Sequence, residues 1–149
     1  MLTRMALAFA CALALPLAAL AETQRTVPPS KPAPNSERRI ALVIGNSKYK
    51  EAPLRNPAND ARAISQALSA TGFTVTVLED ATLIGMRRAI RAFGDDLPKA
   101  AVGIFYYAGH GMQVKGANFL IPVNADIERE DEIADQAIDA NFVLSKMDS

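Results

Sequence analysis

The stretch Ile40-Ala-Leu-Val-Ile44 decides the fold of this chain. An uninterrupted apolar run of this length is typical of a strand that is buried on both faces, as strands inside a parallel sheet are. Gly45 and Asn46 follow the run and end it. We therefore predict that Ile40–Ile44 is a buried strand with helices packed on both of its sides.

A helix is predicted after this strand. Asn56 is a suitable N-cap residue, and Pro57 suits the first helical position because proline lacks the N–H that this position leaves unpaired. Gly72 is expected to end the helix. The face that turns toward the sheet would consist of Ala61, Ile64 and Leu68.

The alternation of strand and helix continues along the chain with two further strands and a helix between them. Phe73–Leu78 is rich in β-branched residues and predicts a second strand, and Val102–Tyr107 is a third apolar strand. Thr82 is expected to cap the helix between them, and Pro98 to stop it. Apolar residues recur on one face of this helix, at Met86, Ile90, Phe93 and Leu97.

Strands that alternate with helices predict an α/β fold, in which an open, mainly parallel sheet has right-handed crossovers and helices on both faces, in three α/β/α layers. Further along, Met112–Val123 predicts two short strands around a turn at residues 115–118. Asp139 is expected to cap a last short helix, Ala140–Met147. No strand follows this helix, so we expect the domain to be incomplete at its C-terminus.

Residues 1–21 have the features of a secretory signal peptide. Arg4 supplies a positive charge, an uncharged apolar run follows, and Ala19-Leu20-Ala21 fits the small-x-small cleavage pattern. Residues 22–37 contain four prolines and predict an extended linker, and residues 38–149 would form the domain. We expect a periplasmic or secreted protein that loses Cys11 together with the signal peptide.

Composition restricts the classes of partner and cofactor. The 149 residues carry 16 basic and 16 acidic side chains, so we expect no nucleic-acid partner and, after cleavage of the leader, no membrane association. One cysteine excludes a disulfide scaffold. The turn after the first strand lacks the glycine spacing of a nucleotide site, and one histidine without a thiol disfavours zinc. The acidic segment 124–139 lacks EF-hand spacing and favours a solvated loop over a calcium site. We expect no cofactor and no metal.

The segment Tyr106-Tyr107-Ala108-Gly109-His110-Gly111 is the strongest sign of chemistry. It holds the only histidine of the chain, just beyond the carboxyl end of the third predicted strand, where open α/β sheets bind their ligands. Imidazole suits general acid–base catalysis, and the Gly111 N–H could point at an oxyanion. The alternative is a histidine that only makes a hydrogen bond in a glycine-rich turn.

Four segments, in this order, resemble the large-subunit portion of bacterial caspase-like proteins. They are RRIALVIGN at 38–46, LRNPANDA at 54–61, FYYAGHGMQ at 105–113 and NFLIPV at 118–123. These proteins are relatives of caspases and metacaspases and are cysteine peptidases (peptidase C14). The resemblance covers residues 38–147 and agrees with the α/β fold predicted above.

The resemblance implies a secreted cysteine endopeptidase that cleaves proteins or peptides. It implies that His110 is the general base and acid of a Cys–His dyad, with the Gly111 N–H in the oxyanion hole. It also implies that Asp60 lies near the pocket for the residue preceding the scissile bond, where an acid favours Arg or Lys. Arg55 lies near the region from which caspases take an arginine for selectivity toward Asp. Without the resemblance, Asp60 is explained as an exposed acid that stabilises the start of a helix.

The sequence departs from the family pattern at the nucleophile. The family places a cysteine in an Asp-Ala-Cys or Asp-Ser-Cys motif after the next core strand, and this sequence contains neither motif. Ser47 is a poor substitute because a nucleophilic serine needs a paired, oriented base. We therefore expect an inactive N-terminal portion of a peptidase, truncated before its cysteine. The alternative is a non-catalytic caspase-like module that binds a protein partner.

Overall fold

A three-stranded parallel sheet lies at the centre of this computed structural model, which describes residues 37–148. Its strands are β1 (Arg39–Gly45), β2 (Phe73–Glu79) and β3 (Val102–Ala108), in the order β2-β1-β3. The predicted parallel sheet is therefore confirmed, with the Ile40–Ile44 run in its middle strand. The predicted signal peptide and nearly all of the predicted linker lie outside the described residues.

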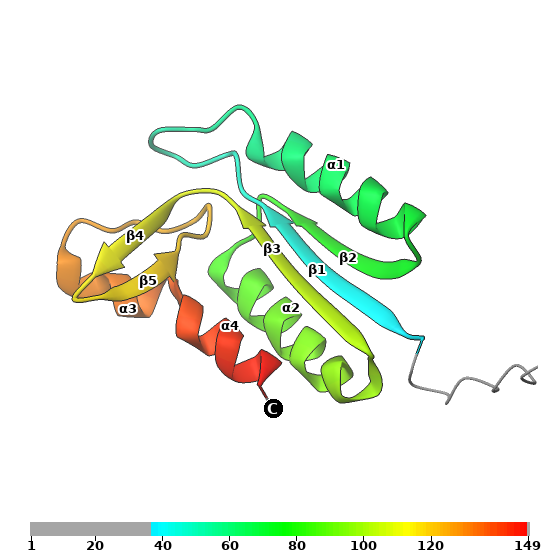
Figure 1. Cartoon of the computed structure of the whole chain (residues 1–149). Coiled ribbons are helices and arrows are strands. Elements are labelled where there is room, and N and C mark those ends of the chain that lie inside the picture. The colour runs from blue at the N-terminus through cyan, green and yellow to red at the C-terminus, as the bar shows by residue number, and fades with distance from the viewer. Residues whose placement is uncertain (1–36, 149) are drawn as a thin grey trace, which may run out of the picture. The chain divides into compact units, whose positions relative to one another are not determined.

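Helices cover both faces of this sheet (Figure 1). On one face lies α1 (Pro57–Ala70), and on the other lie α2 (Leu83–Asp96) and α4 (Ala140–Met147). The chain passes from β1 to β2 through α1, then back across β1 to β3 through α2. Because both the direction and the face reverse, the two crossovers have the same hand. This is the three-layer α/β fold that the sequence predicts.

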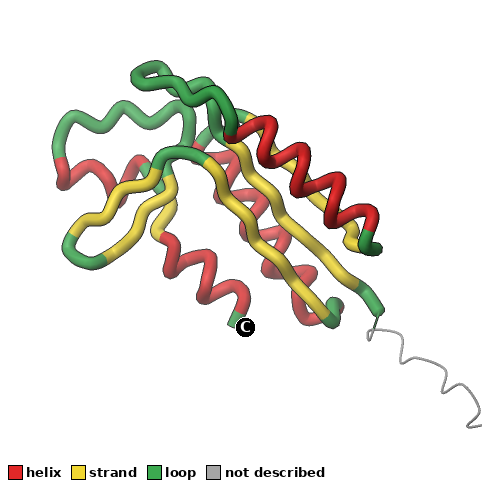
Figure 2. Tube along the Cα trace, turned by 45° about the horizontal axis from the view of Figure 1, so that its top comes forward, coloured by secondary structure: helices red, strands yellow, loops and turns green. Residues whose placement is uncertain are grey.

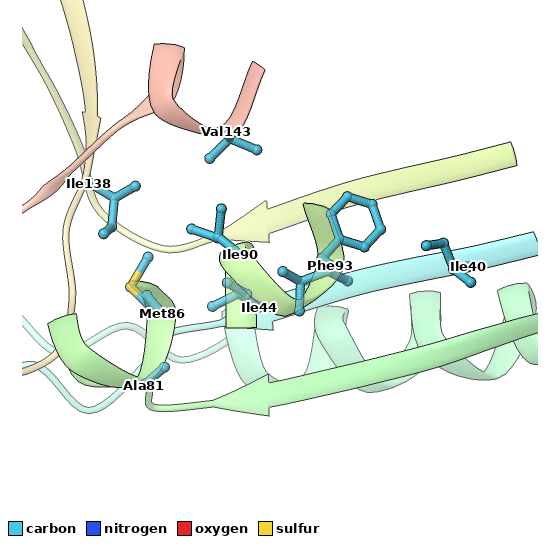
Figure 3. Close-up of a cluster of buried hydrophobic side chains, with 9 residues drawn as sticks. Ile40, Ile44, Ala81, Met86, Ile90, Phe93, Ile138 and Val143 are labelled. Atoms are coloured by element: carbon cyan, nitrogen blue, oxygen red, sulfur yellow. The ribbon is translucent and has the colours of Figure 1, made fainter. Parts of the chain in front are cut away.

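The alternation of side chains along β1 explains why its sequence is apolar without interruption. Ala41 and Val43 pack against α1, where Ala61 is fully buried. Their neighbours in the strand point to the other face and pack with α2 and α4 (Figure 3). That cluster includes Ile40, Leu42, Ile44, Met86, Ile90, Phe93 and Val143.

The predicted helix ends are confirmed except at one position. Thr82 accepts a hydrogen bond from the Gly85 N–H, and Asp139 accepts one from the Asn141 N–H. Asn56 occupies the N-cap position of α1, but its side chain makes no capping bond. Its backbone is helical (φ −102°, ψ −29°), whereas a capping residue adopts an extended backbone that turns the side chain back to the helix. The Ser47 Oγ accepts from the Ala58 N–H instead.

A second, antiparallel sheet extends the predicted hairpin. It consists of β4 (Gly111–Val114), β5 (Ala117–Leu120) and the short β6 (Ile138–Asp139). The hairpin turn is shorter than predicted: Lys115 and Gly116 alone form it, both with positive φ. Two positive φ values are what a two-residue turn between twisted strands requires.

The predicted acidic loop contains short helical turns. A 3₁₀ turn at Glu130–Glu132 leads into α3 (Ile133–Gln136). The Glu132 carboxylate accepts hydrogen bonds from the Glu128 and Arg129 N–H groups, and Ile133 is buried under the segment. None of the helices in the described part of the chain is long and apolar enough to cross a membrane.

Candidate active site

A pocket of about 730 Å³ opens beside the carboxyl end of β3. Residues 49–52, 110–112, 121 and 125–128 line it. In Figures 1 and 2 the loops that carry these residues gather at the end of the parallel sheet to which β1 and β3 point. Ligands of open α/β sheets bind at this end. His110, which the sequence predicts as the reactive group, lies in the wall of this pocket.

The His110 ring is fixed by a backbone carbonyl. Its Nε2 lies 2.7 Å from the Ala52 oxygen. Because a carbonyl only accepts hydrogen bonds, Nε2 carries a proton and the neutral ring keeps its lone pair on Nδ1. Among the described residues no hydrogen-bond partner of Nδ1 is found. The nitrogen that can take up a proton is therefore the one without a protein partner.

The backbone of His110 is held by two tyrosine hydroxyls. Its N–H donates to the Tyr49 oxygen at 2.8 Å, and its carbonyl lies 2.8 Å from the Tyr107 oxygen. The Ile121 N–H also donates to that carbonyl. Burial, followed by the hydrogen bond with Tyr49, raises the pKa of Tyr107 far above its ordinary value. Tyr107 therefore remains a protonated donor at any pH at which the protein would act.

Gly109 is needed for the close approach of these hydroxyls. A Cβ at this position would lie 2.5 Å from the oxygens of both Tyr49 and Tyr107. Contacts this short do not occur between real side chains, so another residue would push the hydroxyl pair apart. The glycine before His110 is therefore required by the tyrosine pair.

The Gly111 N–H points away from its neighbouring strand. Gly111 is opposite Leu120, and the ladder bond beside this pair runs from the Ile121 N–H to the His110 carbonyl. In this antiparallel register Gly111 belongs to a pair that exchanges no hydrogen bonds, so its N–H faces the outer side of β4. Gly111 is exposed and lines the pocket. A donor in this position is available to an oxygen in the pocket.

The loop after β1, which carries Tyr49 and Ala52, is anchored at its start by Asp80. One Asp80 oxygen accepts from the Ser47 and Lys48 N–H groups at 2.8 and 2.9 Å, and the other lies 2.9 Å from the Lys48 Nζ. Burial would raise the pKa of Asp80, but the hydrogen bonds from Lys48 and Ser47 outweigh it and lower the pKa. The carboxylate therefore stays charged and fixes the loop.

Acidic side chains outnumber basic ones around the pocket. Glu51, Asp126 and Glu128 line it, against Lys50 alone. Lys50 and Asp126 form an ion pair at 3.7 Å, but both side chains are largely exposed, so the pair is weak. A cationic ligand group would therefore be favoured in this pocket. No group of three or more potential metal ligands occurs among the described residues.

The other predicted site residues lie near this end of the sheet but not in the pocket wall. Asp60 is exposed in the first turn of α1, and Arg55 is exposed in the loop before it. Ser47, which the sequence disfavours as a nucleophile, is buried and accepts the hydrogen bond at the start of α1. Of the predicted site residues, the structure places only His110 and Gly111 in the pocket wall, and their predicted roles remain predictions.

Comparison with known families decides the classification. The profile of the caspase domain family matches residues 38–148, which include the whole sheet and the pocket. The chain belongs to the caspase domain family. This confirms the family and the α/β fold that the four sequence motifs imply.

Two relatives of this caspase domain protein are mammalian. The human mucosa-associated lymphoid tissue lymphoma translocation protein 1 is 39% identical over 93 residues, which are 62% of this chain and 11% of the relative. Its mouse homolog is 38% identical over 93 residues, which are again 62% of this chain and 11% of the relative. The aligned segment thus spans about a tenth of the length of either relative.

Sequence reasoning missed the residues that hold His110 in place. Tyr49 and Ala52 are near each other in sequence but 58 or more residues from His110, and Asp80 follows a different strand. The sequence shows only an aromatic residue between two lysines in a polar loop, and the structure is needed to show that Tyr49 is buried there, with 8% exposed. A large side chain that is buried in such a loop usually has a specific partner.

Proposed function

We propose that this chain carries the histidine of the Cys–His dyad of a caspase-type cysteine endopeptidase, which cleaves proteins or peptides. One observation carries the proposal. The Ala52 carbonyl holds Nε2 of His110, which leaves Nδ1 as the proton acceptor in an open pocket, next to the outward-facing Gly111 N–H. Membership of the caspase domain family supports it.

The chemistry proposed for His110 follows from this geometry. A cysteine thiol placed near Nδ1 would give its proton to the ring, and the resulting thiolate would attack the scissile carbonyl carbon. The Gly111 N–H would stabilise the oxyanion that forms. When the C–N bond breaks, Nδ1–H would return the proton to the leaving amine, and water would then hydrolyse the thioester.

The nucleophile of this reaction is not among the described residues, which contain no cysteine. We propose that it belongs to a longer form of the domain, beyond residue 149, as the family resemblance implies. The 149-residue chain alone is then inactive. Turnover of fluorogenic peptides ending in Arg or Lys by purified residues 22–149, lost in His110→Ala, would contradict this.

The proposed substrate preference is for a basic residue before the scissile bond. The acidic pocket wall supports it, with Glu51, Asp126 and Glu128 against Lys50. The test is a chimera of residues 22–148 with the C-terminal part of a relative that carries the Asp-Ala-Cys motif. We expect cleavage after Arg above Lys, and negligible cleavage after Asp. A preference for Asp would instead indicate that Arg55, which lies outside this pocket wall, binds the residue before the scissile bond.

The contribution of Asp60 can be measured in the same chimera. Its carboxylate is exposed, so a pair with substrate arginine that stays in water is worth about 1 kcal/mol, or about fivefold in kcat/KM. Asp60→Ala should lower cleavage after Arg by this factor and leave an uncharged substrate unaffected. An equal loss for both substrates would mean that Asp60 supports α1 rather than substrate binding.

We also propose a periplasmic or secreted location, supported by the sequence of residues 1–21 alone. N-terminal sequencing of the exported protein should begin at Glu22. The second candidate function, a non-catalytic module that binds a protein, is favoured by the lack of a cysteine in residues 37–148. A reading frame after codon 149 without an Asp-Ala-Cys or Asp-Ser-Cys motif would favour that module.

A further inference from the structure

We infer that Tyr49 is a positioning residue for His110, which it holds at both the backbone and the ring. Its hydroxyl accepts from the His110 N–H at 2.8 Å. Its ring lies against the imidazole, with centroids 4.4 Å apart and planes inclined by 51°. The catalytic value of this contact rests on the proposed function, but the contact itself can be tested without any activity.

The Tyr49 hydroxyl has two further oxygen neighbours, and the Tyr107 hydroxyl also lies 2.8 Å from the Ile121 carbonyl oxygen. The Tyr49 oxygen lies 3.0 Å from the Ile121 carbonyl and 3.1 Å from the Tyr107 oxygen. If Tyr49 donates to the Ile121 carbonyl, Tyr107 is free to donate to the His110 carbonyl, and each hydroxyl proton is used once. The Tyr49 oxygen then has its lone pairs available to the His110 N–H.

Tyr49 and Ala52 act on His110 from the same loop. The Ala52 carbonyl holds Nε2 while the Tyr49 ring packs against the imidazole, so rotation of the ring would break one contact or the other. Asp80 fixes Ser47 and Lys48, the two residues just before Tyr49. The start of the loop is thereby tied to the end of β2. This set of contacts fixes the His110 ring in the pocket wall and leaves Nδ1 as the nitrogen that is not bonded to the loop.

The test uses the full chain, because His110 is its only histidine and its ring signals need no assignment. Tyr49→Phe keeps the aromatic ring and removes the hydroxyl. Tyr106→Phe is the matched control: it makes the same chemical change on β3, but Tyr106 packs on the opposite face of the sheet, against the α1 cluster. Nitrogen-15 NMR measures the ratio of imidazole tautomers, and hydrogen exchange measures protection of the His110 amide.

We expect the unchanged chain to hold mainly the tautomer with the proton on Nε2. In Tyr49→Phe the His110 amide should exchange about tenfold faster relative to the Ala101 amide, which donates to the Arg38 carbonyl outside this network, as for loss of one hydrogen bond. The tautomer ratio should move toward that of free imidazole. Tyr106→Phe should leave both quantities within about twofold of the unchanged chain.

Equal exchange and equal tautomer ratios in the two variants would overturn the inference. If Tyr49→Phe does not fold, the inference can still be tested on the unchanged chain. Nuclear Overhauser effects between the Tyr49 and His110 rings are expected there, and their absence would overturn the inference. Failure of the chimera to cleave peptides would count against the proposed function and leave these NMR results unaffected.

Discussion

At the scale of single residues, the Asp80 carboxylate does not line the pocket but fixes the loop that forms part of its wall. Asp80 adopts a left-handed backbone (φ 52°), and its side chain receives two N–H groups from the start of the pocket loop. Asp and Asn tolerate this backbone conformation better than most residues. Asp80 therefore fixes the start of the loop that carries Tyr49 and Ala52, and these two residues in turn hold His110.

Asp80→Ala is expected to destabilise the fold by about 1–3 kcal/mol, because the N–H groups of Ser47 and Lys48 lose the hydrogen bonds to their acceptor. Asp80→Asn keeps an acceptor oxygen and the tolerance for positive φ, so it should cost less. Denaturant unfolding at neutral pH measures both. Equal losses in the two variants would show that the charge matters and the shape does not.

The charge of Asp80 should also make stability depend on pH. Its pKa is lowered from 3.8 in the folded state, so its stabilisation is present above that value and is lost as the pH falls through the folded pKa. The gap in unfolding free energy between the unchanged chain and Asp80→Asn should therefore shrink below about pH 4. A gap that is constant between pH 7 and pH 3 would contradict the assignment.

At this scale the sequence predicts the positions of His110 and Gly111 from one segment, and their catalytic roles stay predictions. His110 and Gly111 adjoin a predicted strand end, and the structure places both in the wall of one pocket. Tyr49, Ala52 and Asp80 could not be predicted, because each acts through hydrogen bonds to residues at least 32 positions away. No local pattern reports such contacts.

At the scale of elements, α1 packs closely on β1 because Gly45 ends the strand. A Cβ on Gly45 would overlap the Pro57 carbonyl and lie 2.6 Å from the Ala61 Cβ. Periodicity predicted these elements well, since the apolar faces of α1 and α2 are the ones buried. The capping role of Ser47 and the strand β6 escaped prediction, because both depend on contacts between distant segments.

Gly45→Ala is expected to cost about 1–3 kcal/mol, since backbone atoms of α1 cannot yield without moving the helix. Gly103→Ala is the matched variant on β3, where the new methyl would meet the flexible end of the Leu97 side chain. It should cost less than Gly45→Ala. Thermal unfolding compares the two, and an equal or reversed order would contradict the close packing of α1 on β1.

At the scale of the whole molecule, the parallel sheet has a free edge. Within residues 37–148, β3 pairs only with β1, and its side chains are at most partly buried. An unpaired edge of this kind favours association with other strands. The sequence predicts the three strands of this sheet, whereas the pairing of β6 with β5 in the second sheet joins segments that are distant in sequence and could not be predicted.

We therefore expect purified residues 22–149 to be of low stability and to self-associate as their concentration rises. Sedimentation velocity over a range of concentrations measures the association. Val102→Lys should reduce it, because Val102 is 42% exposed at the start of β3 and a lysine there opposes strand pairing. A monomer at all concentrations with a cooperative melt would refute this expectation.

The central claim is that His110 is the general base of a caspase-type peptidase. The most direct measurement is kcat/KM of the chimera with restored Asp-Ala-Cys segment on an Arg peptide, compared with its His110→Ala variant. With the fold of both confirmed by circular dichroism, the account predicts a loss of at least about 100-fold, as for removal of a general base. Cleavage within a few-fold of the unchanged chimera in His110→Ala would contradict the account.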